Sequence, residues 1–218
     1  MFPTTLKKHA FGLFTFAVLC LGSSISTQAD PIIYSSAGLS NFAQVITFEE
    51  AALSQNEPVT NQFAAFGVTF SGAFANPDPR SYPNLSDNRI GNFIPNTFAR
   101  PFSISFAGVQ NQAAFALVTA PGISTITSFL NGVPVETFSV TTDGTAANNF
   151  FGFQNSAFNQ IQISVASFDQ ALLLDNLQST SAPTATPEPA AILLLGTGLA
   201  GVAAKMRRRR GLANSNIL

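Results

Sequence analysis

Residues 102–106 read Phe-Ser-Ile-Ser-Phe, and residues 161–165 read Ile-Gln-Ile-Ser-Val. In both stretches apolar and polar side chains alternate with a period of two, which is the pattern of a strand with one buried and one solvated face. Strand character recurs in seven other stretches, at residues 44–48, 66–70, 113–119, 123–130, 133–140, 150–153 and 171–177. Short strands at this spacing, with turn residues between them, predict one all-β domain.

The connections between these stretches favour antiparallel pairing. Asn131-Gly132 joins two strand-like runs and is the strongest short hairpin signal, and Thr142-Asp143-Gly144 marks a second turn. Residues 50–57 fit either a short helix or an irregular connection. Because the chain has 22 Phe and no Trp, Phe is expected to fill the core. We therefore predict a two-sheet antiparallel sandwich of the jelly-roll or lectin-like type over residues 30–178.

The charges are unevenly distributed along the 218 residues. The formal net charge is −1, yet residues 30–181 contain ten acids and only three bases, Arg80, Arg89 and Arg100. This acidic region does not suit a nucleic-acid partner. It also contains no His, Cys or Lys, which excludes from it Ser-His-Asp, Cys-His and Ser-Lys catalysis and the usual zinc sites.

Residues 1–29 have the features of a secretory signal peptide. Lys7 and Lys8 precede an uncharged apolar run at residues 11–21, which is too short for an ordinary membrane span. Small and polar residues follow. We predict cleavage by signal peptidase after Ala29, with Ser26 as the alternative, and hence export of the chain.

The C-terminus has three features in a fixed order. A Ser/Thr/Ala/Pro-rich linker is expected at residues 179–186, and fifteen apolar or small residues without charge stand at 190–204. As a helix this run would measure about 22 Å, enough to cross a thin bilayer. The basic cluster that follows would stay in the cytoplasm by the positive-inside rule; it consists of Lys205, Arg207, Arg208, Arg209 and Arg210. Residues 211–218 form a short tail.

Pro187-Glu188-Pro189, the apolar helix and the arginine run together resemble the PEP-CTERM sorting signal of Gram-negative bacteria, here at residues 187–210. The resemblance implies that exosortase, a membrane protease-transpeptidase, processes the chain near the tripeptide. It implies an inner-membrane anchored precursor and a product at the cell surface or secreted. Such signals occur in species that make extracellular polysaccharide, so the resemblance also implies a role in exopolysaccharide or biofilm.

The segment between Asn76 and Ala99 differs from the rest of the domain. It is long and rich in Pro and polar residues, which is typical of a functional loop or an insertion. It combines an aromatic ring with planar polar groups, as a sugar site requires. We take as candidate polysaccharide-binding residues Arg80, Tyr82, Asn84, Asp87 and Asn88; the alternative is an ordinary polar loop.

Four residues are candidates for a structural calcium site: Glu49, Glu50, Asp175 and Asn176. Calcium prefers carboxylate and amide oxygens. These residues lie at the end of the first predicted strand and in the last one, which is similar to extracellular sandwich domains whose first and last strands are neighbours. Alternatively, the two glutamates are solvated strand-end charges and Asp175 caps a turn. A carboxylate at residue 175, within an apolar run, must be hydrogen-bonded or metal-bound, and Arg100 is a candidate ion-pair partner.

These features favour a non-enzymatic, exported surface or matrix protein that binds polysaccharide, with no catalytic residue. Two alternatives stay open. The first is an extracellular glycoside hydrolase, which requires two carboxylates in a cleft, one with a raised pKa. The second is a structural protein that self-associates through strand edges with few charges.

Overall fold

The computed structural model describes residues 30–77, 80–94, 101–167, 170–182 and 199. Its secondary structure is twelve strands and one 3-10 turn, η1 (Ala64–Phe66). The strands are β1 (Asp30–Ser35), β2 (Gln44–Ile46), β3 (Pro58–Val59), β4 (Val68–Ser71), β5 (Ala73–Ala75), β6 (Ile90–Gly91), β7 (Phe102–Thr119), β8 (Gly122–Leu130), β9 (Val133–Thr142), β10 (Phe150–Gln154), β11 (Phe158–Val165) and β12 (Leu172–Ser181). The all-β, antiparallel architecture expected from the sequence is confirmed.

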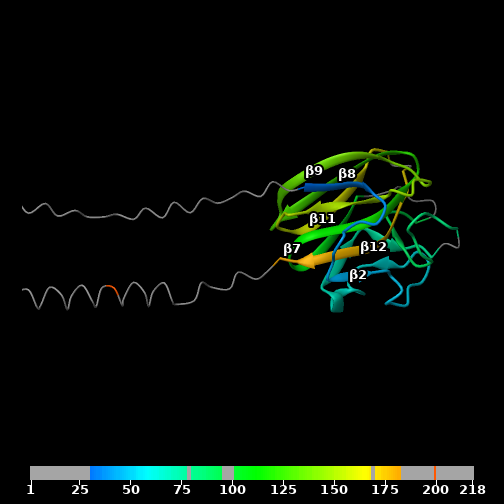
Figure 1. Cartoon of the computed structure of the whole chain (residues 1–218). Helices are drawn as coiled ribbons and strands as arrows, with labels where there is room; N and C mark the ends of the chain where they lie inside the picture. The colour runs from blue at the N-terminus through cyan, green and yellow to red at the C-terminus, as the bar shows by residue number, and fades with distance from the viewer. Residues whose placement is uncertain (1–29, 78–79, 95–100, 168–169, 183–198, 200–218) are drawn as a thin grey trace, which may run out of the picture.

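Strand β7 joins the two layers of the fold. Its first half pairs with β4 and β11, and its second half pairs with β10 and β12. One layer is therefore β4–β7–β11–β8–β9, and the other is β1–β10–β7–β12 with β2 and β6 on β12 and with β5 and β3 beyond β6. Figure 1 shows the two layers packed face to face. They form one hydrogen-bonded sheet, because the same strand belongs to both.

The inward-facing positions of β7 change parity between its halves. Phe102, Ile104 and Phe106 face the core in the first half, whereas Phe115 and Leu117 do so in the second. Between them residues 107–109 are exposed, and the register with β11 shifts at this level. Extra residues of this kind on one strand of a pair bend that strand and increase its twist. The sequence pattern therefore predicts two separate strands where the structure has one long, bent strand.

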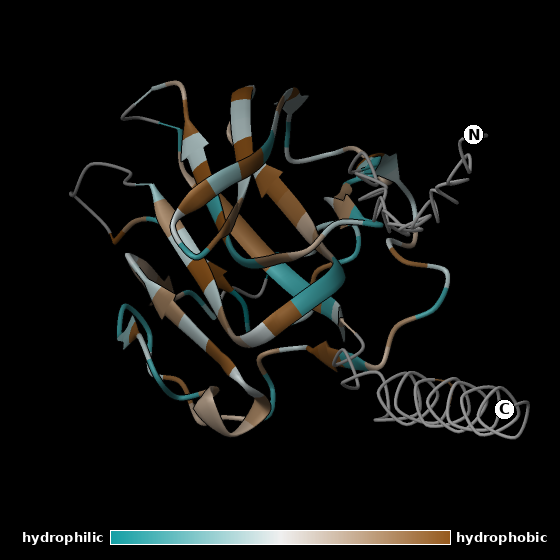
Figure 2. Ribbon diagram, turned by 90° about the vertical axis from the view of Figure 1, so that its left-hand side faces the viewer, coloured by the Kyte–Doolittle hydropathy of each residue, from teal (hydrophilic) through white to brown (hydrophobic). Residues whose placement is uncertain are grey.

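The core lies between the layers and is built from Phe, Ile and Leu. Figure 2 shows apolar and polar residues alternating along the strands that enclose it. Phenylalanine rings meet edge to face, for example Phe48 and Phe63 with centroids 5.1 Å apart. A smaller cluster covers the other face of β7, where Ala114 and Ala116 contact Ile32, Leu39 and Phe150. The second half of β7 is thus buried on both faces.

The predicted hairpin turn is present, but several connecting segments differ from the prediction. Asn131 and Gly132 have φ values of 53° and 82°, and Leu130 pairs with Val133, so the predicted tight hairpin is confirmed. Residues 50–57 form an irregular connection without a helix. The sequence did not indicate the short strands β1, β3 and β5. Strand β12 continues to Ser181, past residue 178, because its last residues still pair with β7.

None of the helical segments in the described ranges has the length and apolarity to cross a membrane. The predicted signal peptide, its cleavage site at Ala29 and the predicted transmembrane helix at 190–204 lie outside the described residues.

Gly152 on β10 permits the closest approach between strands, and this gives a test of the fold. A Cβ at this position would lie 2.0 Å from the carbonyl oxygen of Ala113. We expect Gly152→Ala to destabilise the domain by more than about 4 kcal/mol or to prevent folding, because backbone must move. Urea denaturation measures the loss.

Gly108→Ala is the matched control, because a Cβ at Gly108 on β7 meets nothing within 4 Å. A Gly152→Ala protein as stable as this control would contradict the described packing of β10 on β7.

Candidate functional site

The loops that carry most of the predicted site residues lie at one end of the sandwich. Strand register places Asp30 beside Gln154, and places the end of β12 beside the start of the second half of β7. The described domain therefore begins and ends at the same end, on the left of Figure 1. The loops at residues 80–94 and 143–149 lie at the other end, which we call the distal end.

Asp175 fixes the first of these loops to β12. It is fully buried at a β-bulge, where Asn176 has a φ of 50°. One carboxylate oxygen, Oδ2, accepts hydrogen bonds from the backbone N–H and the hydroxyl of Ser86, both at 2.6 Å. The other, Oδ1, accepts from the N–H of Asn176 at 2.5 Å. Asp175 therefore acts on the loop as a hydrogen-bond acceptor.

Burial raises the pKa of Asp175 to about 6. The hydrogen bonds from Ser86 and Asn176 and the nearby charge of Arg89 act in the opposite direction and limit the rise. The predicted ion-pair partner, Arg100, lies outside the described residues. Arg89, which is also buried, is the cation whose charge acts on this carboxyl.

Asparagine side chains join the two distal loops. Asn84 has a φ of 58°, and its Nδ2 donates to the carbonyl of Ala147 at 2.8 Å and to Oδ1 of Asn149 at 2.7 Å. Asn149 in turn donates to the carbonyl of Pro83, and Asn176 donates to the carbonyl of Asn84, both at 2.8 Å. Asn84, a predicted ligand-binding residue, is thus engaged in holding the loops together.

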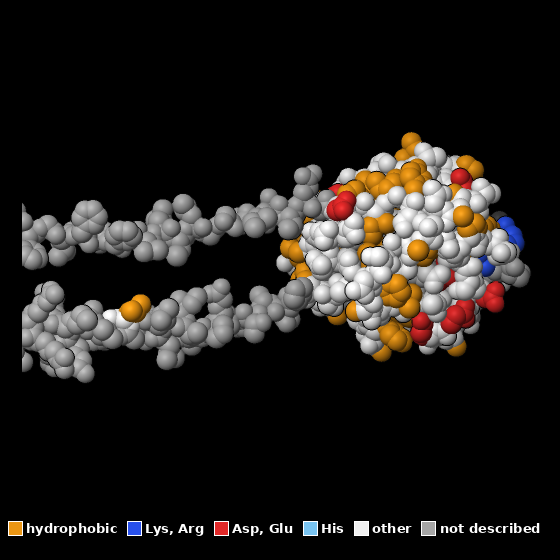
Figure 3. Space-filling view, in the orientation of Figure 1, with side chains coloured by type: hydrophobic (Ala, Val, Ile, Leu, Met, Phe, Trp, Pro, Cys, Tyr) orange, Lys and Arg blue, Asp and Glu red, His pale blue; other side chains and the backbone are white. Residues whose placement is uncertain are grey.

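Arg80 and Tyr82 lie together, as the sequence predicted. The guanidinium carbons of Arg80 and Arg89 lie 5.8 Å and 5.2 Å from the centroid of the Tyr82 ring, within cation–π range. Arg80 and Tyr82 line a pocket of about 260 Å³, together with Phe93, Val118 and Leu173. In Figure 3 the blue side-chain atoms stand at the right-hand edge, which is the distal end.

The remaining predicted loop residues lie apart from this pocket. Asp87 is exposed. Asn88 donates from its backbone N–H and its Nδ2 to the two oxygens of Glu49, at 2.8 Å and 2.5 Å. Glu50 accepts from the N–H and hydroxyl of Thr47 within its own turn. In the described ranges no three acidic, histidine or cysteine side chains form a group that could hold a metal. Calcium binding therefore stays a prediction.

A second pocket, of about 360 Å³, opens beside the loop at residues 143–149, and sequence reasoning missed it. Tyr34, Thr141, Asp143 and Asn148 form its rim. Its floor consists of the core residues Leu117 and Phe151. The chain has two tyrosines, and each lines one of these pockets. Tyrosine in a Phe-rich domain was the signal that could have found both.

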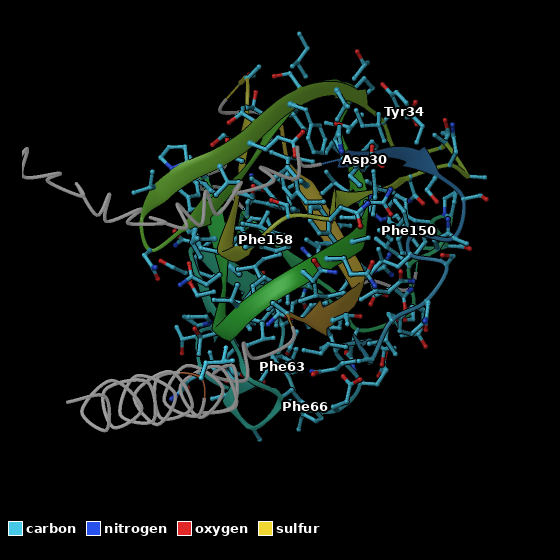
Figure 4. The ribbon with its side chains drawn as sticks, turned by 60° about the vertical axis from the view of Figure 1, so that its left-hand side comes forward. Asp30, Tyr34, Phe63, Phe66, Phe150 and Phe158 are labelled. Carbon is cyan, nitrogen blue, oxygen red and sulfur yellow. The ribbon has the colours of Figure 1, made fainter. Side chains whose placement is uncertain are left out.

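Tyr34 is held in position by both layers. Its hydroxyl donates to the carbonyl of Thr141 at 3.0 Å, and its ring meets Phe151 edge-on with centroids 5.5 Å apart. The backbone at Tyr34 has a φ of 55°, and β1 has a register irregularity before Ser35. A bulky residue at positive φ is uncommon and is a feature found at functional sites. Tyr34 is 44% exposed, and Figure 4 shows it at the distal end of β1.

Asp143 presents an ionised carboxylate to the same pocket. Its Oδ1 accepts hydrogen bonds from the N–H and hydroxyl of Thr145 and from the N–H of Ala146. These bonds, first among them the one from the N–H of Thr145, lower the pKa of Asp143. No described residue donates to Oδ2. The pocket rim thus offers an acceptor oxygen and the Asn148 amide beside an exposed aromatic ring.

The chain contains the PEP-CTERM protein-sorting motif, which matches residues 185–210. This confirms the resemblance drawn from Pro187-Glu188-Pro189 and the basic cluster, and it makes the chain an exported, membrane-passing protein processed by exosortase. Curated protein sequences contain no match to the chain.

Comparison with solved structures gives weak likenesses to this chain. TmCBM61 in complex with β-1,4-galactotriose is 13% identical, with a TM-score of 0.34 over 59% of this chain and 100% of its own. A family 29 carbohydrate-binding module is 11% identical, with a TM-score of 0.35 over 74% and 98%. An arabinose-bound α-L-arabinofuranosidase is 16% identical, with a TM-score of 0.37 over 64% of this chain and 31% of its own. Likenesses this weak carry no inference about a ligand.

The raised pKa of Asp175 predicts a specific pH dependence of stability. Its pKa of about 6 in the folded domain exceeds the value of about 3.9 in an unfolded chain. Its contribution to stability is therefore complete below pH 4 and is lost as the pH rises through 6, by about 3 kcal/mol. The urea midpoint of the wild type should therefore fall between pH 4 and 7, and the midpoint of Asp175→Asn should not show this fall.

Asp87→Asn is the control, because Asp87 is exposed in the same loop. Parallel pH profiles for wild type and Asp175→Asn would contradict the assignment.

The calcium prediction has its own test. If Glu49 and Asp175 bind Ca²⁺, adding the ion should raise the melting temperature, EDTA should reverse the rise, and Glu49→Gln should abolish it. Glu57→Gln, on another part of the fold, should leave the response unchanged. A melting temperature that does not respond to Ca²⁺ or EDTA would rule out the site.

Proposed function

We propose that this exported protein is a non-enzymatic polysaccharide-binding protein and that the pocket between Tyr34, Asp143 and Asn148 holds the glycan. One observation carries the proposal: the half-exposed Tyr34, fixed by its hydrogen bond to Thr141, stands beside Oδ2 of Asp143 and the Asn148 amide in a pocket of about 360 Å³. This volume lies in the range typical of small-molecule sites.

The chemistry of the rim suits a sugar. Sugar rings combine apolar C–H faces with hydroxyls that both donate and accept. An aromatic ring packs against the faces, while Asp143 accepts and Asn148 donates or accepts at the edges. The hydrogen bonds of Tyr34 and Asp143 within the protein fix these groups in advance, which reduces the entropy cost of binding.

The layer formed by β4, β7, β11, β8 and β9 adds a polar, uncharged surface. Its outward-facing side chains are mostly Ser, Thr and Gln, and some pair across strands, as Thr125 does with Ser139 at 2.9 Å and Thr127 with Thr137 at 3.0 Å. Such hydroxyl-rich faces are compatible with a hydrated polysaccharide matrix. They contain no group that would repel an acidic or a neutral polymer.

The placement of the pocket also fits a protein sorted through its C-terminus. The described chain leaves the sandwich at the end of β12, opposite the distal end. In our proposal signal peptidase removes residues 1–29, the helix at 190–204 holds the precursor in the inner membrane, and exosortase then transfers it to the cell surface or releases it. The distal pocket would face away from the membrane throughout.

The carboxylates in the described ranges support a binder over a glycoside hydrolase. Two carboxyl groups have a raised pKa, Asp175 and Glu136, and neither lines one of the two pockets. Asp143, which does line a pocket, has a lowered pKa and is therefore a poor general acid. Self-association is less favoured, because Pro134 and Glu136 interrupt the exposed edge strand β9.

Glycan binding can be tested directly. The signal-processed protein is screened on an array of plant and bacterial polysaccharides, and the best ligand is titrated by calorimetry. We expect Tyr34→Ala and Asp143→Asn each to weaken binding about tenfold or more, because they remove the ring and the charged acceptor.

Phe42→Ala is the matched control, because Phe42 is 41% exposed and does not line the pocket. Binding that Tyr34→Ala and Phe42→Ala weaken equally would refute the pocket as the site. Sedimentation of the same sample shows whether the protein is a monomer or an assembly.

A further inference from the structure

A group of polar atoms without a counter-charge lies at the end of the sandwich opposite the distal pockets. Glu136 on β9 is in phase with the inward-facing Phe138 and Val140, and it pairs across strands with Ser128 on β8. Ser128 is fully buried. Neither Oε2 of Glu136 nor Oγ of Ser128 is reached by solvent, and neither makes a hydrogen bond. Buried polar atoms without partners are rare and call for an explanation.

Asp30, the first described residue, begins β1 opposite Gln154 of β10, and the preceding residue of β10, Phe153, packs against Phe138 of β9 with ring centroids 5.2 Å apart. Oδ2 of Asp30 accepts a hydrogen bond from Nε2 of Gln154 at 2.8 Å. Burial and, second to it, the negative charge of Asp30 raise the pKa of Glu136. Figure 4 shows β1 running beside β9, with Asp30 at one end and Tyr34 at the other. Two carboxylates and an unpartnered hydroxyl thus lie at one end of the sandwich, near the start of β1, the end of β8 and the start of β9.

No cation in the described ranges serves this group. Both described bases, Arg80 and Arg89, lie at the distal end, and the sequence has no Lys or His between residues 30 and 181. The nearest source of positive charge is the chain itself. Hydrolysis of the Ala29–Asp30 peptide bond gives the hydroxyl of water to the Ala29 carboxyl group and leaves an amino group on Asp30. That amine, with an ordinary pKa of about 7.7–8.0, takes up a proton and is largely an ammonium at neutral pH.

We propose that Asp30, Glu136 and Ser128 form a binding site for the α-ammonium group that signal peptidase creates at Asp30. The ammonium has three donors and one positive charge. Its N–H donors suit Oε2 of Glu136 and Oγ of Ser128, which receive no hydrogen bond. Its positive charge suits the carboxylates of Asp30 and Glu136, which have no cationic partner in the described ranges. Before cleavage the same nitrogen is a neutral amide, so the precursor keeps an uncompensated pair. The site therefore stabilises only the processed protein. This inference rests on the cleavage position within the proposed function and is independent of the glycan pocket.

The test compares three forms of the chain from Asp30 to Leu218, purified in detergent. The first begins with a free amine at Asp30. The second retains Ala29, which moves the amine by about 3.5 Å. The third begins at Asp30 but is acetylated on the α-amine at pH 6.5, where Lys205, the one other amine, is protected by its higher pKa. At pH 7 we expect the first form to melt about 2–4 °C above the other two, the size of shift that a single ion pair gives in a domain of this length.

Glu136→Gln in each form separates this site from general effects of the N-terminus. We expect it to remove the difference among the three forms, whereas Asp87→Asn at the distal end should leave the difference unchanged. Equal melting temperatures of the free and acetylated forms would overturn the proposal, as would a difference that survives Glu136→Gln. N-terminal sequencing of the exported protein must give Asp30. Thr27 as the first residue would overturn this site and leave glycan binding at the distal pocket unaffected.

Discussion

The fold depends on the burial of one strand that is shared by both layers. The first half of β7 contributes Phe102 and Ile104 to the core, and its second half is covered on one face by the core and on the other by the small cluster around Ala114 and Ala116. Because β4, β10, β11 and β12 all pair with it, the layers cannot separate without breaking this strand. The remaining strands extend the sheet outward from these four partners of β7.

The alternation of apolar and polar residues was sufficient to predict most of this sheet. Residues 102–106 and 161–165 carry a local pattern, and so does the Asn-Gly turn at 131. Strand β1 was missed because its pairing depends on residues far along the chain, as Asp30 depends on Gln154. Strands β3 and β5 have two and three residues and are too short to show a period. The union of two predicted strands in β7 was missed because a bend with exposed residues at 107–109 interrupts the periodicity.

The candidate site was predicted in part, and the reason is geometric. Arg80 and Tyr82 share a loop, so their proximity is local. The pocket rim around Tyr34 combines β1 with a loop more than a hundred residues away, and no local pattern signals that meeting. The domain has no Lys or His, and its distal loops are connected by neutral amide side chains. Hydrogen bonds of Asn84, Asn149 and Asn176 make these connections and do not depend on pH.

Strand β1 has one hydrogen-bonded neighbour, β10, yet it carries Asp30 at one end and Tyr34 at the other. An edge strand of six residues is the element of such a sandwich that detaches most easily. Its local opening would release the N-terminus and dismantle the pocket rim in a single event. Both proposed sites therefore depend on β1 staying paired with β10, and amide hydrogen exchange along β1 reports on that pairing.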